Sequence, residues 1–318
     1  MNPLLRCFFL AIALIGCGSA YAQFPDKPIT LVVPFPAGST TDSVARSLSL
    51  RAQDYLGQPI IVENKPGAEG QLAAQDVARA TADGYRITMA TSGNLSLLPA
   101  MRIKPPYNVM EDFSPIADIG RFTFVFYVNS NLPVKNLAEF AEHAKKHPGE
   151  LTYATGNNTG IVTFAQLKAR MGVDMAHVRY KGEPPAVLDL VAGRVDAMIG
   201  TTIGVPYVNQ GRIRALAIMS RGRSAAFPST PTLEESGFGQ LPITSWAGVL
   251  GPKGMPADVV ARISSAFTRA AADPKVQMQM DKLGFSLERG GPVQLRRLME
   301  EQLTIHAQLV KQADLLPE

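Results

Sequence analysis

The sequence is almost without cysteine, and the two cysteines that it has, Cys7 and Cys17, both lie in an apolar segment at the amino terminus. A chain that has lost this segment carries no thiol, which excludes disulfide bonds, thiol catalysis and cysteine-ligated metal. Long hydrophobic runs are also lacking. The stretch around Leu10–Ile15 is well short of the ~20 apolar residues that a bilayer-spanning helix needs, and no later segment is long enough either.

The amino terminus has the features of a cleavable export signal. Met1–Arg6 carries one positive charge, an apolar stretch follows, and Ala20-Tyr21-Ala22 supplies the small-x-small pattern that signal peptidase reads. We therefore expect residues 1–22 to be a signal peptide, the mature chain to begin at Gln23 and the protein to be periplasmic. Leu14-Ile15-Gly16-Cys17 also fits a bacterial lipobox, so a lipoprotein attached through Cys17 is the alternative.

Charge of one sign is not concentrated anywhere in the chain. The 31 basic and 27 acidic side chains are spread along the sequence, without the clustered basic footprint that nucleic-acid binding needs. We therefore expect no nucleic-acid partner. A mildly basic balance does suit a protein that meets anionic solutes.

Catalytic and metal-binding motifs are equally scarce. The four histidines show no metal-ligand spacing, and His143 and His147, although four residues apart, fall in a polar, Lys-rich helix end typical of a solvated face. No G-x-S-x-G elbow is present. The glycine-rich stretches 67–70 and 156–160 match neither a dinucleotide-binding loop nor a Walker loop. The sequence therefore predicts a protein that is not an enzyme and needs no metal or cofactor.

Strand and helix patterns alternate along the chain, which predicts an α/β fold with βαβ units and a parallel sheet. The roughly 300 residues that remain after residues 1–22 exceed what one hydrophobic core usually serves. We therefore expect a first lobe of residues 23–124 and 246–318, a second lobe of residues 125–245, and a hinge where the chain crosses twice. Strands are predicted at 29–33, 59–63, 85–90, 115–120, 122–128, 151–155, 178–180, 195–200, 213–219 and 246–251, and helices at 44–57, 71–80, 137–146, 162–171, 185–192, 256–272, 274–283 and 292–313.

Two polar, glycine-containing loops follow predicted strands, one in each lobe. Open α/β sheets bind ligands beyond the carboxyl ends of their strands, where backbone N–H groups and the positive end of the next helix make an anion site. Matched loops in two hinged lobes predict a clamp for a dicarboxylate. Ordinary N-capping is the alternative for each loop alone. The loops are Ala37-Gly38-Ser39-Thr40-Thr41-Asp42 and Thr155-Gly156-Asn157-Asn158-Thr159-Gly160.

Each residue type in the first loop has an expected role. Gly38 should permit a close approach to the backbone. Ser39, Thr40 and Thr41 should add hydroxyl donors. Asp42 should hold the loop and suit the helix dipole, since an acid is a poor neighbour for an anionic ligand.

A series of short motifs runs along nearly the whole predicted mature chain. They include Phe24-Pro-Asp-Lys-Pro-Ile29, Val32-Val-Pro-Phe-Pro-Ala-Gly38, Leu56-Gly-Gln-Pro59, Val62-Glu-Asn-Lys-Pro-Gly-Ala68, Asp83-Gly-Tyr85, Asp112-Phe-Ser-Pro-Ile116, Tyr180-Lys-Gly182, Gly193-Arg-Val-Asp196 and Pro231-Thr-Leu-Glu-Glu-Ser-Gly237. In order and spacing these motifs resemble the Bug-type solute receptors, the periplasmic components associated with tripartite tricarboxylate transporters.

The resemblance implies a two-lobed, hinged type II periplasmic binding protein fold with the ligand in the cleft between the lobes. It also implies a small carboxylate ligand, which we expect to be an aliphatic or aromatic dicarboxylate, and a monomeric receptor that meets membrane permease subunits. The family holds one carboxylate at the first-lobe loop, partly through ordered water. Carried over to this sequence, with Phe35 and Thr201 added, the expected ligand-binding residues are Phe35, Gly38, Ser39, Thr40, Thr41, Asp42, Thr91, Ser92, Thr155, Asn157, Asn158, Thr159, Tyr180, Lys181 and Thr201.

Several positions depart from the family pattern. Ser39 stands where many members have a second glycine, Arg179 where a proline is usual, and Glu183 where glycine or alanine is commoner. Gly200-Thr201-Thr202 replaces a more familiar Phe-Asp pair, which leaves the role of Thr201 open. Lys181 has a structural surface role as its alternative.

Three functions are consistent with these sequence features. The first is transport, in which a captured carboxylate is handed to a membrane permease. The second is sensing, in which the protein reports ligand occupancy to a two-component system. The third is an unrecognised periplasmic enzyme, which turnover of the bound ligand would reveal. The scarcity of catalytic motifs favours the first two.

Overall fold

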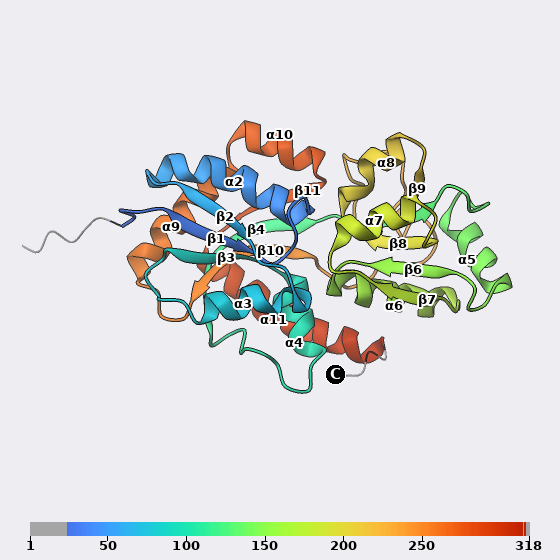
Figure 1. Ribbon diagram of the computed structural model, residues 1–318, viewed down its shortest axis with the longest axis horizontal. Helices are drawn as coiled ribbons and strands as arrows, with labels where there is room; N and C mark the ends of the chain where they lie inside the picture. The colour runs from blue at the N-terminus through green and yellow to red at the C-terminus, as the bar shows by residue number, and fades with distance from the viewer. Residues whose placement is uncertain (1–23, 314, 316–318) are drawn as a thin grey trace, which may run out of the picture.

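Two α/β lobes lie side by side in the computed structural model, which describes residues 24–313 and 315 (Figure 1). The predicted signal peptide, with Cys7 and Cys17, lies outside the described residues. No helix among those described is long and apolar enough to cross a membrane.

The first lobe is built on a six-stranded sheet whose order is β11-β4-β10-β3-β1-β2. β1 pairs in parallel with β2 and β3, whereas β10 is antiparallel to β3 and β4, and β11 is antiparallel to β4. The strands are β1 (Ile29–Val33), β2 (Ile60–Asn64), β3 (Arg86–Thr91), β4 (Phe113–Phe122), β10 (Trp246–Pro252) and β11 (Phe285–Gly290).

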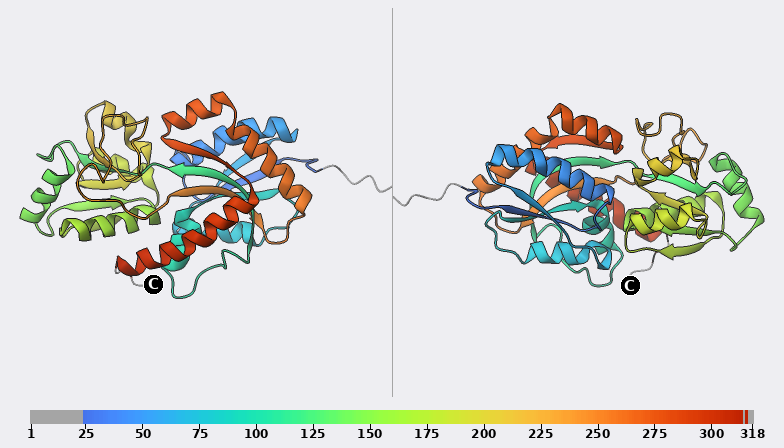
Figure 2. Two further views of the ribbon diagram at one scale, coloured as in Figure 1. Left: turned by 180° about the vertical axis from the view of Figure 1, so that it is seen from behind. Right: turned by 45° about the horizontal axis from the view of Figure 1, so that its top comes forward.

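Helices cover both faces of this sheet (Figures 1 and 2). One face carries α2 (Thr40–Leu56), α9 (Ala257–Ala271) and α10 (Pro274–Lys282), whose apolar side chains share a buried core with β1. The other face carries α3 (Gln71–Ala78) and α11 (Pro292–Gln312), packed on Trp246. Three short helical segments complete the lobe: η1 (Ala68–Gly70), η2 (Gly93–Leu97) and α4 (Leu98–Ala100).

The second lobe has a five-stranded sheet of order β7-β6-β8-β5-β9. β6 is parallel to β7 and β8, and β5 is antiparallel to β8 and β9. The ring of Phe126 packs against Phe140 and Phe164, with ring centroids 4.9 and 5.5 Å away. The elements are β5 (Val125–Asn129), α5 (Leu137–Lys146), β6 (Thr152–Thr155), α6 (Asn158–Met171), β7 (Ala176–Arg179), α7 (Glu183–Val191), β8 (Ala197–Gly200), η3 (Thr202–Gly204), α8 (Val205–Asn209) and β9 (Ile213–Ile218).

Both sheets are therefore mixed, and the expectation of a parallel sheet is wrong. A parallel neighbour requires a crossover connection, usually a helix. The chain instead passes directly from one lobe to the other at β4–β5, and it returns as β10, which runs antiparallel between β3 and β4.

The two crossings lie against each other and form the hinge. The strand predicted at 122–128 is broken, because β4 ends at Phe122 and β5 begins at Val125. The N–H of Phe122 donates to the carbonyl of Ser245 at 2.8 Å, which joins the outgoing crossing to the returning one. The expected ranges 23–124 with 246–318, and 125–245, divide the strands between the two sheets, and we retain them as proposed lobe boundaries.

Most predicted elements match the structure within a few residues, and two discrepancies bear on the site. α6 begins at Asn158 rather than Val162, so the loop before it is shorter than expected. The helical segments at 93–100 follow β3 where a loop was expected. β11 was missed because it is a largely exposed, polar edge strand.

Candidate functional site

The first-lobe loop is held by the side chains of Ser39 and Asp42. Ser39 is the N-cap of α2, and its Oγ accepts a hydrogen bond from the N–H of Asp42 at 3.3 Å. Asp42 accepts from the N–H of Gly38 at 3.0 Å, from Asn64 Nδ2 at 2.9 Å and from Arg46 Nε at 3.1 Å. Burial opposes ionisation of Asp42, but these donors outweigh it and hold its pKa below the usual range. The expected holding role of Asp42 agrees with these contacts.

Gly38 serves the loop through its backbone conformation. Its φ is +79°, in the left-handed region that favours glycine, and a Cβ added there would meet nothing within 4 Å. Gly38 is also exposed and does not line the cavity described below. The positive φ accounts for glycine at this position, and the expected close approach of a ligand to the Gly38 backbone stays a prediction.

The second-lobe side chains that were expected to bind ligand have partners within the protein. Asn157 is the N-cap of α6, with Oδ1 accepting from the N–H of Gly160 at 2.8 Å. Thr155 Oγ1 lies 2.7 Å from His177 Nε2, and the Tyr180 hydroxyl donates to Asp189 at 2.8 Å. The capping alternative thus describes Asn157, whose remaining amide donor faces a different group.

That group is Glu183, which was noted in the sequence as a departure but was not among the expected site residues. Its Oε1 accepts from Asn157 Nδ2 at 2.7 Å, and both of its oxygens lie 3.1 Å from the N–H of Thr201. Oε2 also accepts from the hydroxyl of Thr201. Burial raises the pKa of Glu183, and the hydrogen bonds from Thr201 and Asn157 act in the opposite direction.

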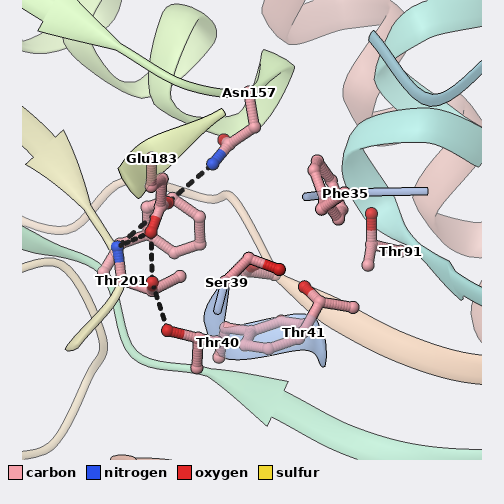
Figure 3. Close-up of a pocket in the computed structure, with 11 residues that line it drawn as sticks. Phe35, Ser39, Thr40, Thr41, Thr91, Asn157, Glu183 and Thr201 are labelled. Atoms are coloured by element: carbon pink, nitrogen blue, oxygen red, sulfur yellow. Dashed lines mark hydrogen bonds between the residues drawn. The ribbon is translucent and has the colours of Figure 1, made fainter. Parts of the chain in front are cut away.

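A small cavity of about 30 Å³ lies between these two loops (Figure 3). Glu183, Thr201 and Thr40 lie on one side of it, and Phe35 and Thr91 lie on the other (Figure 3). A cavity of this volume holds about two water molecules. Its lining residues are Phe35, Ser39, Thr40, Thr41, Thr91, Phe122, Phe124, Asn157, Glu183, Thr201 and Ser245.

A larger cavity of about 550 Å³ adjoins the small one and shares Phe35 and Asn157 with it. It contains Thr155, Tyr180 and Lys181 of the expected site, together with Arg179, which lies 3.6 Å from the carboxylate of Glu69. Its volume falls within the ~300–1,000 Å³ range of small-molecule sites. The other lining residues are Pro34, Pro36, Pro66, Gly67, Ala68, Gly70, Gly156 and Ile161.

Three expected site residues instead connect the lobes. Ser92 Oγ lies 3.4 Å from Thr159 Oγ1, and Asn158 Nδ2 donates to the carbonyl of Gly93 at 3.1 Å. Like Gly38 and Asp42, these residues line neither of the two cavities. A further contact, from Thr40 Oγ1 to Thr201 Oγ1 at 2.8 Å, bridges the lobes at the wall of the small cavity.

Four residues that line the small cavity were not among the expected site residues. Phe122, Phe124 and Ser245 come from the two crossings, so only the hinge prediction pointed toward them. The fourth is Glu183, for which an acid directly after Tyr180-Lys181-Gly182 was the available signal. Among the described residues, no group of three or more His, Cys, Asp or Glu side chains could hold a metal ion.

The fold and the cavities define a class of protein: a two-lobed solute-binding receptor with its site between the lobes. The profile described as "Tripartite tricarboxylate transporter family receptor" matches residues 44–315. The chain belongs to this family of tripartite tricarboxylate transporter receptors.

Solved structures agree with this assignment. The periplasmic binding protein BugD is 32% identical, with a TM-score of 0.88 and coverage of 93% of this chain and 100% of that one. MatC from Rhodopseudomonas palustris with bound malate is 31% identical, with a TM-score of 0.85 and coverage of 90% and 100%. R. palustris Rpa4515 with adipate is 29% identical, with a TM-score of 0.88 and coverage of 92% and 98%.

Proposed function

We propose that this protein captures a small carboxylate in the periplasm, between its two lobes, and delivers it unchanged to the permease of a tripartite tricarboxylate transporter. One observation carries the proposal: the N-terminal end of α2, with the side chains of Ser39, Thr40 and Thr41, opens into a cavity enclosed by both lobes. The malate and adipate named with the solved relatives support a carboxylate as the solute.

The ligand carboxylate has a suitable position at this helix end. Backbone N–H groups at the start of a helix and the positive end of its dipole favour an anion. Thr41 and Thr91 add hydroxyl groups to the same wall (Figure 3). The small cavity takes the carboxylate, with or without a bridging water, and the body of the ligand extends past Phe35 into the larger cavity, where Ile161 and the prolines form apolar walls.

Enclosure by both lobes couples binding to closure. The bond between Thr40 and Thr201 and that between Asn158 and Gly93 exist only when the lobes are together. A ligand that contacts both walls adds to these bonds, so it stabilises the closed arrangement.

A thermal-shift screen of mono- and dicarboxylates tests the proposal. A carboxylate present at 100 times its dissociation constant should add ~2.7 kcal/mol of apparent stability. Thr41→Val should reduce the shift, because it removes a cavity hydroxyl at nearly constant volume. Thr268→Val, on α9 and outside the cleft, should keep it. No shift with any carboxylate, or chemical conversion of a bound one, would overturn the proposal.

A further inference from the structure

Glu183 is a buried acidic residue of the second lobe that packs beside two glycines. Its side chain is 6% exposed, lies in the first turn of α7 and lines the small cavity. A Cβ added at Gly156 would lie 2.4 Å from the backbone N of Glu183, and one at Gly200 would lie 3.6 Å from its Cδ. The absence of a side chain at Gly156 therefore lets the backbone of Glu183 approach the loop after β6, and the carboxyl of Glu183 lies beside Gly200 at the end of β8.

The donors around Glu183 are those that a second ligand carboxylate would use. Asn157 Nδ2 and the N–H of Thr201 follow β6 and β8, at the ends of strands where an α/β sheet presents its anion-binding groups. Both donate to Glu183 instead, as does the hydroxyl of Thr201. The carboxyl of Glu183 thus occupies the position at the second-lobe loop where the sequence predicted that a second ligand carboxylate binds.

The charge on the cavity wall works against a second anion in the same place. No basic side chain is present among the described residues that line the small cavity. Arg179 and Lys181 line only the larger one. Two carboxylates facing each other without a cation or water between them repel strongly in a medium of low dielectric constant.

The carboxylate of Glu183 can still accept one hydrogen bond. An ionised carboxylate has about four acceptor positions. Asn157 Nδ2 and the hydroxyl of Thr201 take one each, and the N–H of Thr201 is shared between both oxygens, so it can keep one of them and release the other position. A ligand group that donates a hydrogen bond fits that position, and a cationic donor favours the ionised form of Glu183, which burial disfavours.

We propose that Glu183 is the specificity-determining residue of this cleft, which selects carboxylates with a hydroxyl or ammonium group at their other end over dicarboxylates. This inference rests on the proposed carboxylate-binding function. It narrows the class of small carboxylates and departs from the dicarboxylate that the sequence predicted. The two walls of the small cavity are complementary to the two polar groups of such a ligand, whose body lies in the adjoining larger cavity. The hydroxyls of Ser39 and Thr41 face its carboxylate, and Glu183 faces its donor.

Titration calorimetry on a matched ligand panel tests the role of Glu183. The probes are succinate, glutarate and adipate, each paired with the ω-hydroxy and ω-amino monocarboxylates of the same carbon number. The wild-type protein should bind a donor-bearing member of at least one pair about tenfold more tightly than the dicarboxylate. Comparing the hydroxy and amino members shows whether a neutral hydroxyl or a charged ammonium group is the preferred donor.

In Glu183→Ala, the donors of Asn157 and Thr201 become available to a second carboxylate. The affinity for the dicarboxylate, divided by the affinity for the hydroxy or amino member of the same pair, should then rise at least about tenfold. Glu183→Gln keeps the volume and removes the charge, so it should lower the preference for the amino member even if the alanine variant folds poorly. Glu139→Ala is the matched control, since Glu139 also lies in the first turn of a second-lobe helix and accepts from an asparagine amide, Asn136 Nδ2 at 2.8 Å.

The possible outcomes separate the inference from the proposed function. Tighter wild-type binding of the dicarboxylate in every pair, or ratios that stay constant in both Glu183 variants, would overturn the inference and leave carboxylate capture intact. Ratios that change as much in Glu139→Ala would also overturn it, because they would reflect net charge alone. Failure of the wild-type protein to bind any carboxylate in the panel or in the thermal-shift screen would overturn the proposed function itself.

Discussion

At the scale of single residues, the candidate site combines two opposite chemistries within a few ångströms. The first-lobe wall offers the hydroxyls of Ser39, Thr40 and Thr41 at a helix N-terminus, whereas the second-lobe wall offers the buried carboxyl of Glu183. The hydroxyl chain from Glu183 through Thr201 to Thr40 joins the two. A ligand in this space therefore meets donors on one side and an acceptor on the other.

The first residue-scale prediction concerns Gly38. A valine at a φ of +79° is strained by roughly 1–3 kcal/mol, and it displaces the Gly38 N–H that donates to Asp42. Because this bond holds the loop that presents the N-terminal end of α2, Gly38→Val should weaken carboxylate binding at least tenfold, about 1.4 kcal/mol. Titration calorimetry measures the loss.

Gly57→Val is the control, since Gly57 has nearly the same φ of +77° at the opposite end of α2. It should lower the melting temperature comparably and keep the affinity. Wild-type affinity in Gly38→Val would place the ligand elsewhere.

Residue roles were the least predictable part of the site. The types Ser, Thr and Asp at the first loop could be read as helix-end residues, and the structure confirms Ser39 as a cap. The partners of Asn157 and Thr155 could not be read, because they come from Glu183 and His177, more than twenty positions along the chain. Long-range pairing of this kind depends on how α7 and β7 pack against β6.

At the scale of elements, α2 and α6 begin in the same way in the two lobes. Each has a polar N-cap that accepts from a backbone N–H three positions further on, Ser39 from Asp42 and Asn157 from Gly160. The element ranges were readable from strand and helix periodicity. The direction of β10 was not, because periodicity carries no information on strand order.

The element-scale prediction compares Asn157 with Thr155. Asn157→Ala removes the cap of α6 and a donor to Glu183, so it should lower the free energy of unfolding by about 1–2 kcal/mol and also weaken ligand binding. Thr155→Ala removes only a bond to a half-exposed histidine and should cost less than about 1 kcal/mol.

Urea denaturation and calorimetry on both variants measure the two quantities separately. Equal losses of stability in Asn157→Ala and Thr155→Ala would show that the cap contributes little. Unchanged affinity in Asn157→Ala would remove the second-lobe loop from the candidate site.

At the scale of the whole molecule, the carboxyl-terminal helix α11 links the lobes at a point away from the hinge. It packs beneath the first-lobe sheet and reaches α6 of the second lobe (Figure 2). Gln166 Nε2 on α6 donates to the carbonyl of Leu309 at 3.4 Å. Leu309 and Val310 share an apolar cluster with Ile161, Val162, Leu97 and Met101. The sequence predicted a helix at residues 292–313, but not its contact with the second lobe.

The prediction at this scale concerns His306, which lies on α11 within this region and is fully buried. Neither ring nitrogen has a hydrogen-bond partner among the described residues, and burial lowers the pKa of His306 from 6.5 to about 4. The unfolded chain therefore binds a proton as the pH falls below 6.5, whereas the folded chain resists protonation until about pH 4. Stability that is fully present above pH 6.5 should be lost between these two values, by up to about 3 kcal/mol from this group.

His306→Leu removes this titration at nearly constant volume, so its free energy of unfolding should fall less steeply with decreasing pH than that of the wild-type protein. Urea denaturation at several values between pH 7 and about pH 4 measures the difference. His147→Leu, at the exposed end of α5, should keep the wild-type dependence. Parallel curves for wild type and His306→Leu would mean that the folded protein accommodates the charged ring, and the contact of α11 with the second lobe would then be insensitive to pH over this range.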